Sequence, residues 1–167
     1  MGEQRQPPDA HAAALTPGTY AKAMTLPMAP AIATEIALTY HVILEALRGG
    51  HCNEDHLASM MQVTMKTMLI ANRGHIKLDH EVLRNAQQGI VRCRRTGLQT
   101  GIWKLDPSTY KTLCEVLATF DRLLATTPFY EFMLASENLN ELIVHCQLQR
   151  RDVTVEIPAG SGGAKRI

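Results

Sequence analysis

Hydrophobic residues recur every three or four positions along most of the chain, which is the spacing of one face of an α-helix. The clearest case runs from Leu105 to Leu124. Its apolar stripe consists of Tyr110, Leu113, Cys114, Leu117, Phe120 and Leu124. Asp106 precedes the stripe as a predicted N-cap, and Pro107 follows at the first helical position, where the missing N–H has no intrahelical partner to lose. This stretch is therefore the best-specified helix in the sequence.

The same periodicity predicts four more helices, over residues 31–48, 54–73, 80–95 and 128–146. Asn53, Asp79 and Thr127 are expected to cap the second, third and last of these helices, because their side chains can accept from free backbone N–H groups. Glycines mark the predicted ends of the first three, at Gly49-Gly50, Gly74 and Gly97.

Two of these helices carry additional signals. The helix over 54–73 is apolar over a wide arc, so we expect it to be central or at an interface. In the helix over 80–95, Gly89 lowers helix stability by roughly 1 kcal/mol relative to Ala. Its presence predicts close packing or a bend at that point.

Short connections between these helices favour antiparallel neighbours. The predicted fold is therefore all-α, an antiparallel bundle of four to five helices over residues 31–146. Five prolines in residues 1–30 predict a flexible arm, which is either disordered or lies across the domain or a second subunit. Residues 147–167 form a predicted tail, in which the alternation of Val153, Val155 and Ile157 allows a short strand.

Composition restricts the class of protein more than its function. The chain has 167 residues, of which 46% are hydrophobic and 20% charged, as in one globular domain. The net charge of +1 excludes a global field that would attract nucleic acid or an anionic membrane, so such binding needs a local patch. Four cysteines without CxxC spacing indicate reduced thiols and a cytoplasmic location. We expect neither a secretion signal nor a membrane-spanning segment.

Candidate catalytic and metal-binding residues do not form a recognisable motif. The sequence has no GxSxG, HExxH, P-loop or GxGxxG pattern, so it predicts no catalytic residue and no cofactor. His51, Cys52, His56, His145 and Cys146 offer the residue types of a zinc site, but adjacent residues point apart and the usual ligand spacing is missing, so no metal site is predicted. His41 and Glu45 lie one turn apart, either as an acid–base pair or, more commonly, as an exposed polar pair.

Charge is distributed in two blocks. Basic residues predominate from Lys66 to Lys104, and acidic residues predominate from Leu105 to Glu141. The basic block supplies a candidate nucleic-acid-binding set on the helix over 80–95: Arg84, Gln88, Arg92, Arg94 and Arg95. Two other interpretations stay open. Either the cations complement helix C-termini, or the two blocks pair with each other within or between subunits.

Methionines gather on the second predicted helix. Met60, Met61, Met65 and Met68 either fill the core or, with Trp103 in a nearby loop, form an adaptable partner-binding surface. Because they spread over more than one face, we expect part of the set to meet a partner. Self-association into a homodimer is the simplest such arrangement.

Part of the chain resembles a known group of proteins. The run from Tyr40 to Gly50 and the run from Arg95 to Trp103, followed by Asp106-Pro107 and Thr127-Pro128, look like small all-helical accessory proteins of bacterial plasmids and prophages. The resemblance covers residues 31–145. It implies a helical accessory protein of a mobile element and carries over no functional residue.

The sequence thus predicts a non-enzymatic helical interaction protein. We expect a cytoplasmic homodimer that acts as a regulator or inhibitor by binding another protein. The alternative is a DNA- or RNA-binding accessory protein that uses the basic helix over residues 80–95.

Overall fold

Helices make up almost all of the chain that the computed structural model describes, which is residues 17–77 and 79–152. They are α1 (Pro17–Met24), α2 (Pro30–Gly49), α3 (Glu54–Ile70), α4 (His80–Thr100), α5 (Pro107–Thr126) and α6 (Phe129–Asp152), with a π-helical turn η1 (Ala71–His75) after α3. Within those residues no β-strand occurs. The predicted all-α class is confirmed.

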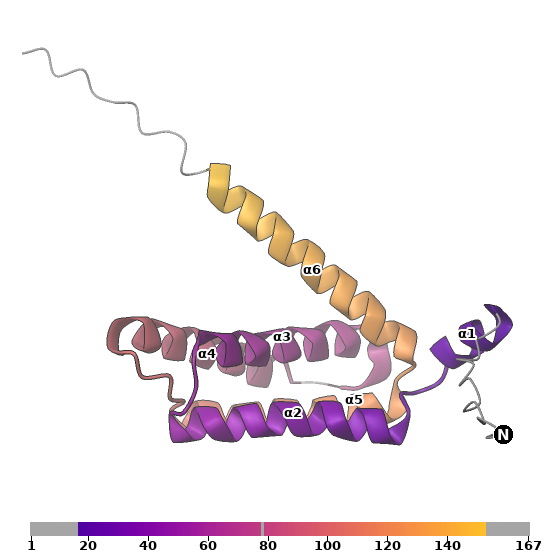
Figure 1. Ribbon diagram of the computed structural model, residues 1–167, viewed down its shortest axis with the longest axis horizontal. Coiled ribbons are helices and arrows are strands. Elements are labelled where there is room, and N and C mark those ends of the chain that lie inside the picture. The colour runs from indigo at the N-terminus through magenta and orange to yellow at the C-terminus, as the bar shows by residue number, and fades with distance from the viewer. Residues whose placement is uncertain (1–16, 78, 153–167) are drawn as a thin grey trace, which may run out of the picture.

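α3 lies among the other helices and contacts α2, α4, α5 and α6 (Figure 1). Its buried residues are Leu57, Met60, Val63, Thr64, Thr67 and Ile70. Thr64 and Thr67 are polar, but their hydroxyls donate to the carbonyls of Met60 and Val63 at 2.8 Å, so neither hydroxyl is left unsatisfied in the core. The wide apolar arc of the sequence therefore corresponds to a central helix, as predicted.

α5 supplies the other large share of the core through Leu113, Val116, Leu117, Phe120, Leu123 and Leu124. The ring of Phe120 makes edge-to-face contacts with Tyr40 of α2 and Phe132 of α6, with centroids 5.5 and 6.1 Å away. Such pairs add to the burial of apolar area. One aromatic ring thus joins three helices.

The predicted N-caps hold at three of the four positions. Asn53 accepts from the amide of His56 at 3.2 Å, Asp79 from Glu81 at 2.8 Å, and Asp106 from Thr109 at 2.8 Å. The hydrogen bond from the Ser108 hydroxyl is the largest of several that hold the pKa of Asp106 well below its ordinary value. The Asp106 carboxylate is therefore ionised in the folded protein near neutral pH.

The predicted N-cap at Thr127 is wrong. The hydroxyl of Thr127 is buried without a hydrogen-bond partner, and Thr127 instead ends α5. The amide of Phe129, at the start of α6, donates to the carbonyl of Leu26 at 2.9 Å. The segment before α2 therefore takes over the role that the Thr127 side chain was expected to play.

Two predicted helix ends are also wrong. α4 continues past Gly97 to Thr100, and Gly101, at φ 74°, ends it. α6 continues past Cys146 to Asp152. The predicted end at Gly50 is correct, since this residue adopts φ 81° in the left-handed region that favours glycine.

The two chain ends are described only in part. The predicted arm contains the short helix α1, which contacts α6, while residues 1–16 lie outside the described part of the chain. The predicted strand at Val153, Val155 and Ile157 also lies outside it.

α2 is the one described helix long and apolar enough, by length and composition, to cross a membrane. Core helices of soluble proteins that pass the same test are mostly buried, whereas the apolar window of α2 is 11% buried. Leu44 and Leu47 are its buried residues, and the helix packs against α3 and α5. It also carries Glu35, His41, Glu45 and Arg48.

α6 leaves the other helices partway along its length. Phe132, Ala135 and Leu139 are buried, whereas Leu142 is 45% and Val144 54% exposed. Figure 1 shows the helix running obliquely away from α2–α5 toward its C-terminal end. Its exposed apolar residues beyond Leu139 are Leu142, Ile143 and Val144.

Two glycines of α4 allow neighbouring side chains to pack directly on its backbone. A Cβ at Gly89 would lie 2.2 Å from the hydroxyl oxygen of Thr109 in α5, so the predicted close packing at Gly89 is confirmed. A Cβ at Gly97 would lie 2.4 Å from the ring of Trp103. This contact explains why Gly97 sits inside the helix instead of ending it.

Substituting Gly97→Ala should lower the free energy of unfolding by about 1–3 kcal/mol, because Trp103 must move. This is the net loss: the cost of displacing the Trp103 ring exceeds the roughly 1 kcal/mol that alanine gains over glycine in helix propensity. Denaturant unfolding followed by circular dichroism measures the loss, and a shift in emission of the only tryptophan reports the displaced ring. The exposed neighbour Thr96→Ala serves as control. Equal or greater stability of the Gly97 variant with unchanged emission would contradict this packing.

Candidate protein-interaction groove

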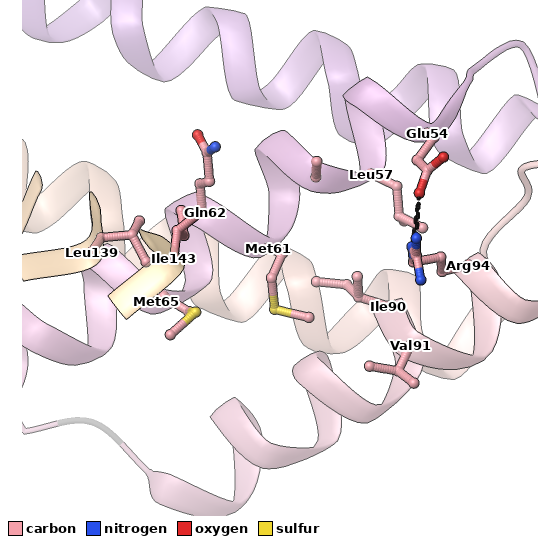
Figure 2. A pocket seen from close by; sticks show the side chains of 11 residues that line it. Glu54, Leu57, Met61, Gln62, Met65, Ile90, Val91, Arg94, Leu139 and Ile143 are labelled. Atoms are coloured by element: carbon pink, nitrogen blue, oxygen red, sulfur yellow. Dashed lines mark hydrogen bonds and ion pairs between the residues drawn. The ribbon is translucent and has the colours of Figure 1, made fainter. Parts of the chain in front are cut away.

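An apolar groove of about 270 Å³ lies where α3, α4 and α6 meet. Its apolar lining comes from Leu57, Ala58, Met61, Met65, Ile90, Val91, Leu139 and Ile143. Figure 2 shows Met61 between α3 and α4, with Leu139 and Ile143 of α6 on the other side. The groove is smaller than the roughly 300–1,000 Å³ usual for small-molecule sites. Its shape and lining instead suit side chains of an apolar helix.

One end of the groove carries an ion pair. The guanidinium of Arg94 lies 2.7 Å from the carboxylate of Glu54 (Figure 2). Both side chains are about half exposed, at 52% and 45%, so the pair is worth at most about 1 kcal/mol to stability. Its effect here is to place charge at the end of an otherwise apolar surface.

The methionine set is divided by the structure. Met60 is completely buried in the core, so the folded chain cannot present it to a partner. Met68 is partly buried against the core. Met61 and Met65 line the groove and are half-buried. Trp103 packs on Gly97 and is not among the lining residues, so the structure does not bring it together with the methionines.

The candidate nucleic-acid residues are all exposed on α4, but two of the arginines are already paired. Arg94 pairs with Glu54, and Arg92 lies 3.7 Å from Asp106 and donates to Thr109. In the described part of the chain, Arg84 and Arg95 make no ion pair. The pair between Arg92 and Asp106 joins the basic block to the acidic block within one chain, which is one of the interpretations that the sequence left open.

The exposed side of α4 is not purely basic. Positions 84, 88, 91, 95 and 98 follow one another at helical spacing, so Val91 lies between the two unpaired arginines and Leu98 follows the second of them. Val91 is 50% and Leu98 58% exposed. A mixture of arginine with exposed aliphatic residues is more typical of protein interfaces than of surfaces that bind phosphates.

A buried carboxylate anchors the base of α6. Glu131 is 7% exposed and accepts from Arg73 at 2.6 Å, while His75 lies 3.3 Å from its other oxygen. Burial alone would raise the pKa of Glu131, but hydrogen bonds from Arg73, Tyr130 and His75 outweigh it and lower the pKa. The residues after α3 thereby fix where α6 begins.

The candidate acid–base pair on α2 is tied to α5. His41 lies 2.9 Å from Asp121, and Glu45 accepts from Tyr110 and Arg48. The hydrogen bond with Glu45, together with one to Cys114, raises the pKa of Tyr110 to about 12. These contacts form a partly exposed polar seam between α2 and α5, in which His41 pairs with Asp121 while Glu45 pairs with Tyr110 and Arg48.

The histidines and cysteines of the candidate zinc set have separate structural roles. His56 completes the capping box with Asn53, and the Cys52 thiol approaches the Ile43 carbonyl. His145 lies near the end of α6, and the side chain of Cys146 is outside the described residues. Among the residues whose side chains the structure describes, no three histidine, cysteine, aspartate or glutamate side chains gather as a metal site would require.

Comparison with protein-family models, with curated proteins and with solved structures finds no match for this chain. The resemblance to plasmid and prophage accessory proteins thus stays a prediction. Function is inferred from the groove and its surrounding charges.

Sequence reasoning did not identify Val91 or Ile143 as site residues. Val91 lies outside the apolar stripe of its helix and next to Arg92. An aliphatic residue on the polar side of a helix is the sequence signal that points to it as a site residue. Ile143 lies one helical turn after the buried Leu139, and it is 36% exposed because α6 leaves the other helices at this point.

Replacing Glu131→Gln should lower the free energy of unfolding by about 1–3 kcal/mol at pH 7, because Arg73 loses its partner. The lowered pKa of Glu131 means that its ionised form stabilises the fold above its unfolded pKa of about 4.3, and that this contribution is lost as the pH falls further. The stability difference between wild type and variant should therefore shrink from pH 6 to pH 3. Denaturant unfolding across that range measures this difference, and Glu115→Gln, at an exposed position of α5, serves as control. A difference independent of pH would contradict the anchor.

Proposed function

We propose that this chain is a non-enzymatic interaction protein that binds an apolar helix of a protein partner in the groove between α3, α4 and α6. In this proposal α2–α5 form an antiparallel four-helix bundle with α6 as an extra helix. The protein acts as a regulator or inhibitor by occupying that partner. From the resemblance in the sequence we further propose an accessory protein of a mobile element, and from its cysteine usage a cytoplasmic location.

The groove itself carries this proposal. It joins an apolar floor on α3 to uncovered aliphatic side chains on both walls, Val91 of α4 and Ile143 of α6. Groups of exposed apolar residues rimmed by charge mark interaction sites on soluble proteins. Met61 and Met65 suit such a site, because methionine side chains adapt to different partner shapes.

Nucleic-acid binding has less support. Phosphates at α4 would have to compete with Glu54 for Arg94 and with Asp106 for Arg92. That leaves Arg84, Gln88 and Arg95, with Val91 in the middle of the surface. A protein partner uses the aliphatic and the arginine side chains together, whereas a phosphate backbone uses only the latter.

Site-specific photocrosslinking tests the proposal. A benzophenone amino acid replaces Val91 beside the groove or, as a matched control, Val42 on the outer side of α2, which is 58% exposed. In the native host, irradiation should give at least fivefold more crosslinked polypeptide at position 91 than at position 42. An adduct with a second copy of the chain, or with a different protein, supports the proposal that a polypeptide binds in the groove.

Equal yields at the two positions, or no adduct at position 91, would contradict the proposal. Adding Met61→Glu to the position-91 protein should abolish the adduct, because it places a charge in the apolar groove. The melting temperature of that variant confirms that the chain is still folded.

A further inference from the structure

The groove wall that α6 supplies is held at its base by a buried charge. In the described part of the chain, Glu131 in the first turn of α6 is the one charged side chain that is buried. Its carboxylate accepts a hydrogen bond from Arg73 at 2.6 Å and lies 3.3 Å from the imidazole of His75. Because a buried charge without partners is costly, Glu131 stays where Arg73 and His75 hold it. We call these three side chains the clasp.

The clasp connects the floor of the groove to one of its walls. Arg73 and His75 belong to η1, which follows directly on α3, and α3 supplies the floor. Glu131 belongs to α6, which supplies the wall residues Leu139 and Ile143. The width of the groove therefore depends on the angle at which α6 leaves η1 and α3.

The other contacts of α6 hold the helix on the core but do little to fix that angle. Phe132, Ala135 and Leu139 are buried, and hydrophobic attraction is non-directional. The amide of Phe129 donates to the carbonyl of Leu26 at 2.9 Å, which fixes where the helix starts. A charge-assisted hydrogen bond, by contrast, depends steeply on distance and angle. The clasp is therefore the strongest directional contact of α6 within the described chain.

A rigid helix transmits any change at the clasp to the groove. α6 contains neither proline nor glycine between Phe129 and Asp152, and sharp kinks almost always need such residues or a bulge. Ile143 lies about 18 Å beyond Glu131 along the helix axis, so a tilt of about 10° at the clasp moves it by about 3 Å. This displacement is close to the carbon–carbon contact distance of about 3.5–4 Å. A small tilt is thus enough to open or close the groove to a layer of side chains.

We propose that the clasp sets the width of the groove, and that Glu131 is a positioning residue for the helix that binds there. Apolar contacts hold α6 on the core, and the clasp selects the angle at which Leu139 and Ile143 face α4. Glu131 does not line the groove itself, so it acts through these wall residues. This inference rests on the proposed function and adds to it the contact that keeps the site in its binding geometry.

A distance measured across the groove tests the clasp. Nitroxides attached to p-acetylphenylalanine replace Gln88 on α4 and Asn140 on α6, which are exposed and do not line the groove. Double electron–electron resonance of the otherwise wild-type chain should give one narrow distance distribution. Glu131→Gln and Arg73→Gln should each shift or broaden it by about 3 Å. The double variant should change it no further, because all three variants remove the same contact.

Gly97→Ala is the control matched for stability. Its expected cost is similar, but it arises at Trp103, which does not line the groove, so the distribution should stay unchanged. The double variant of the clasp buries no unpaired charge, so it keeps the comparison possible if a single variant is unfolded. In cells, Glu131→Gln should also reduce the position-91 adduct about fivefold, whereas Gly97→Ala should not.

An unchanged distribution in the clasp variants, or an equal change in Gly97→Ala, overturns the proposal. A changed distribution with a full yield of adduct also overturns it, because the width of the groove then does not govern binding. Failure of the proposed function is distinguishable from these results. If the wild type itself gives no adduct, the proposed function fails, while the distance measurement still decides whether the clasp sets the angle of α6.

Discussion

Burial of α3 is the constraint on which the rest of this structure depends. The helix is apolar over more than half of its circumference, and its six buried positions contact four other helices. Because the core of the domain forms around it, the remaining helices are positioned by what they must cover. The groove exists because this coverage is incomplete near Met61 and Met65, at the side where α4 and α6 diverge.

α6 behaves as two parts of one helix. Its near half is held by apolar burial at Phe132, Ala135 and Leu139 and by the buried carboxylate of Glu131, which links it to the turn after α3. Beyond Leu139, the apolar residues Leu142, Ile143 and Val144 lack a covering helix within the described chain. A rigid helix anchored at one end carries such residues away from the core. Exposed apolar side chains therefore arise from helix geometry without any special motif.

Local signals in the sequence predicted much of the fold. Apolar periodicity placed α2–α6, and the caps at Asn53, Asp79 and Asp106 formed because an N-cap depends on residues within one turn. The errors occurred where distant contacts decide. Gly97 looks like a helix end until Trp103 is seen packed on it, and Thr127 looks like a cap until Leu26 supplies the acceptor for α6.

The candidate site was less predictable for the same reason. Met61 and Met65 were identified, but sequence spacing cannot separate them from Met60, which faces the core one residue away. Nor can it show that Arg92 and Arg94 are paired with Asp106 and Glu54, since Glu54 is 40 residues from Arg94 along the chain. Which half of α6 is covered depends on the angle at which the helix leaves the bundle, and that angle is a property of tertiary packing.

Hydrogen exchange measured by mass spectrometry tests most directly the claim that burial of α3 holds the core together while α6 leaves that core beyond Leu139. The account predicts that the buried part of α3 exchanges most slowly and that residues 140–145 exchange much faster. Exchange of α3 as fast as residues 140–145 would contradict it.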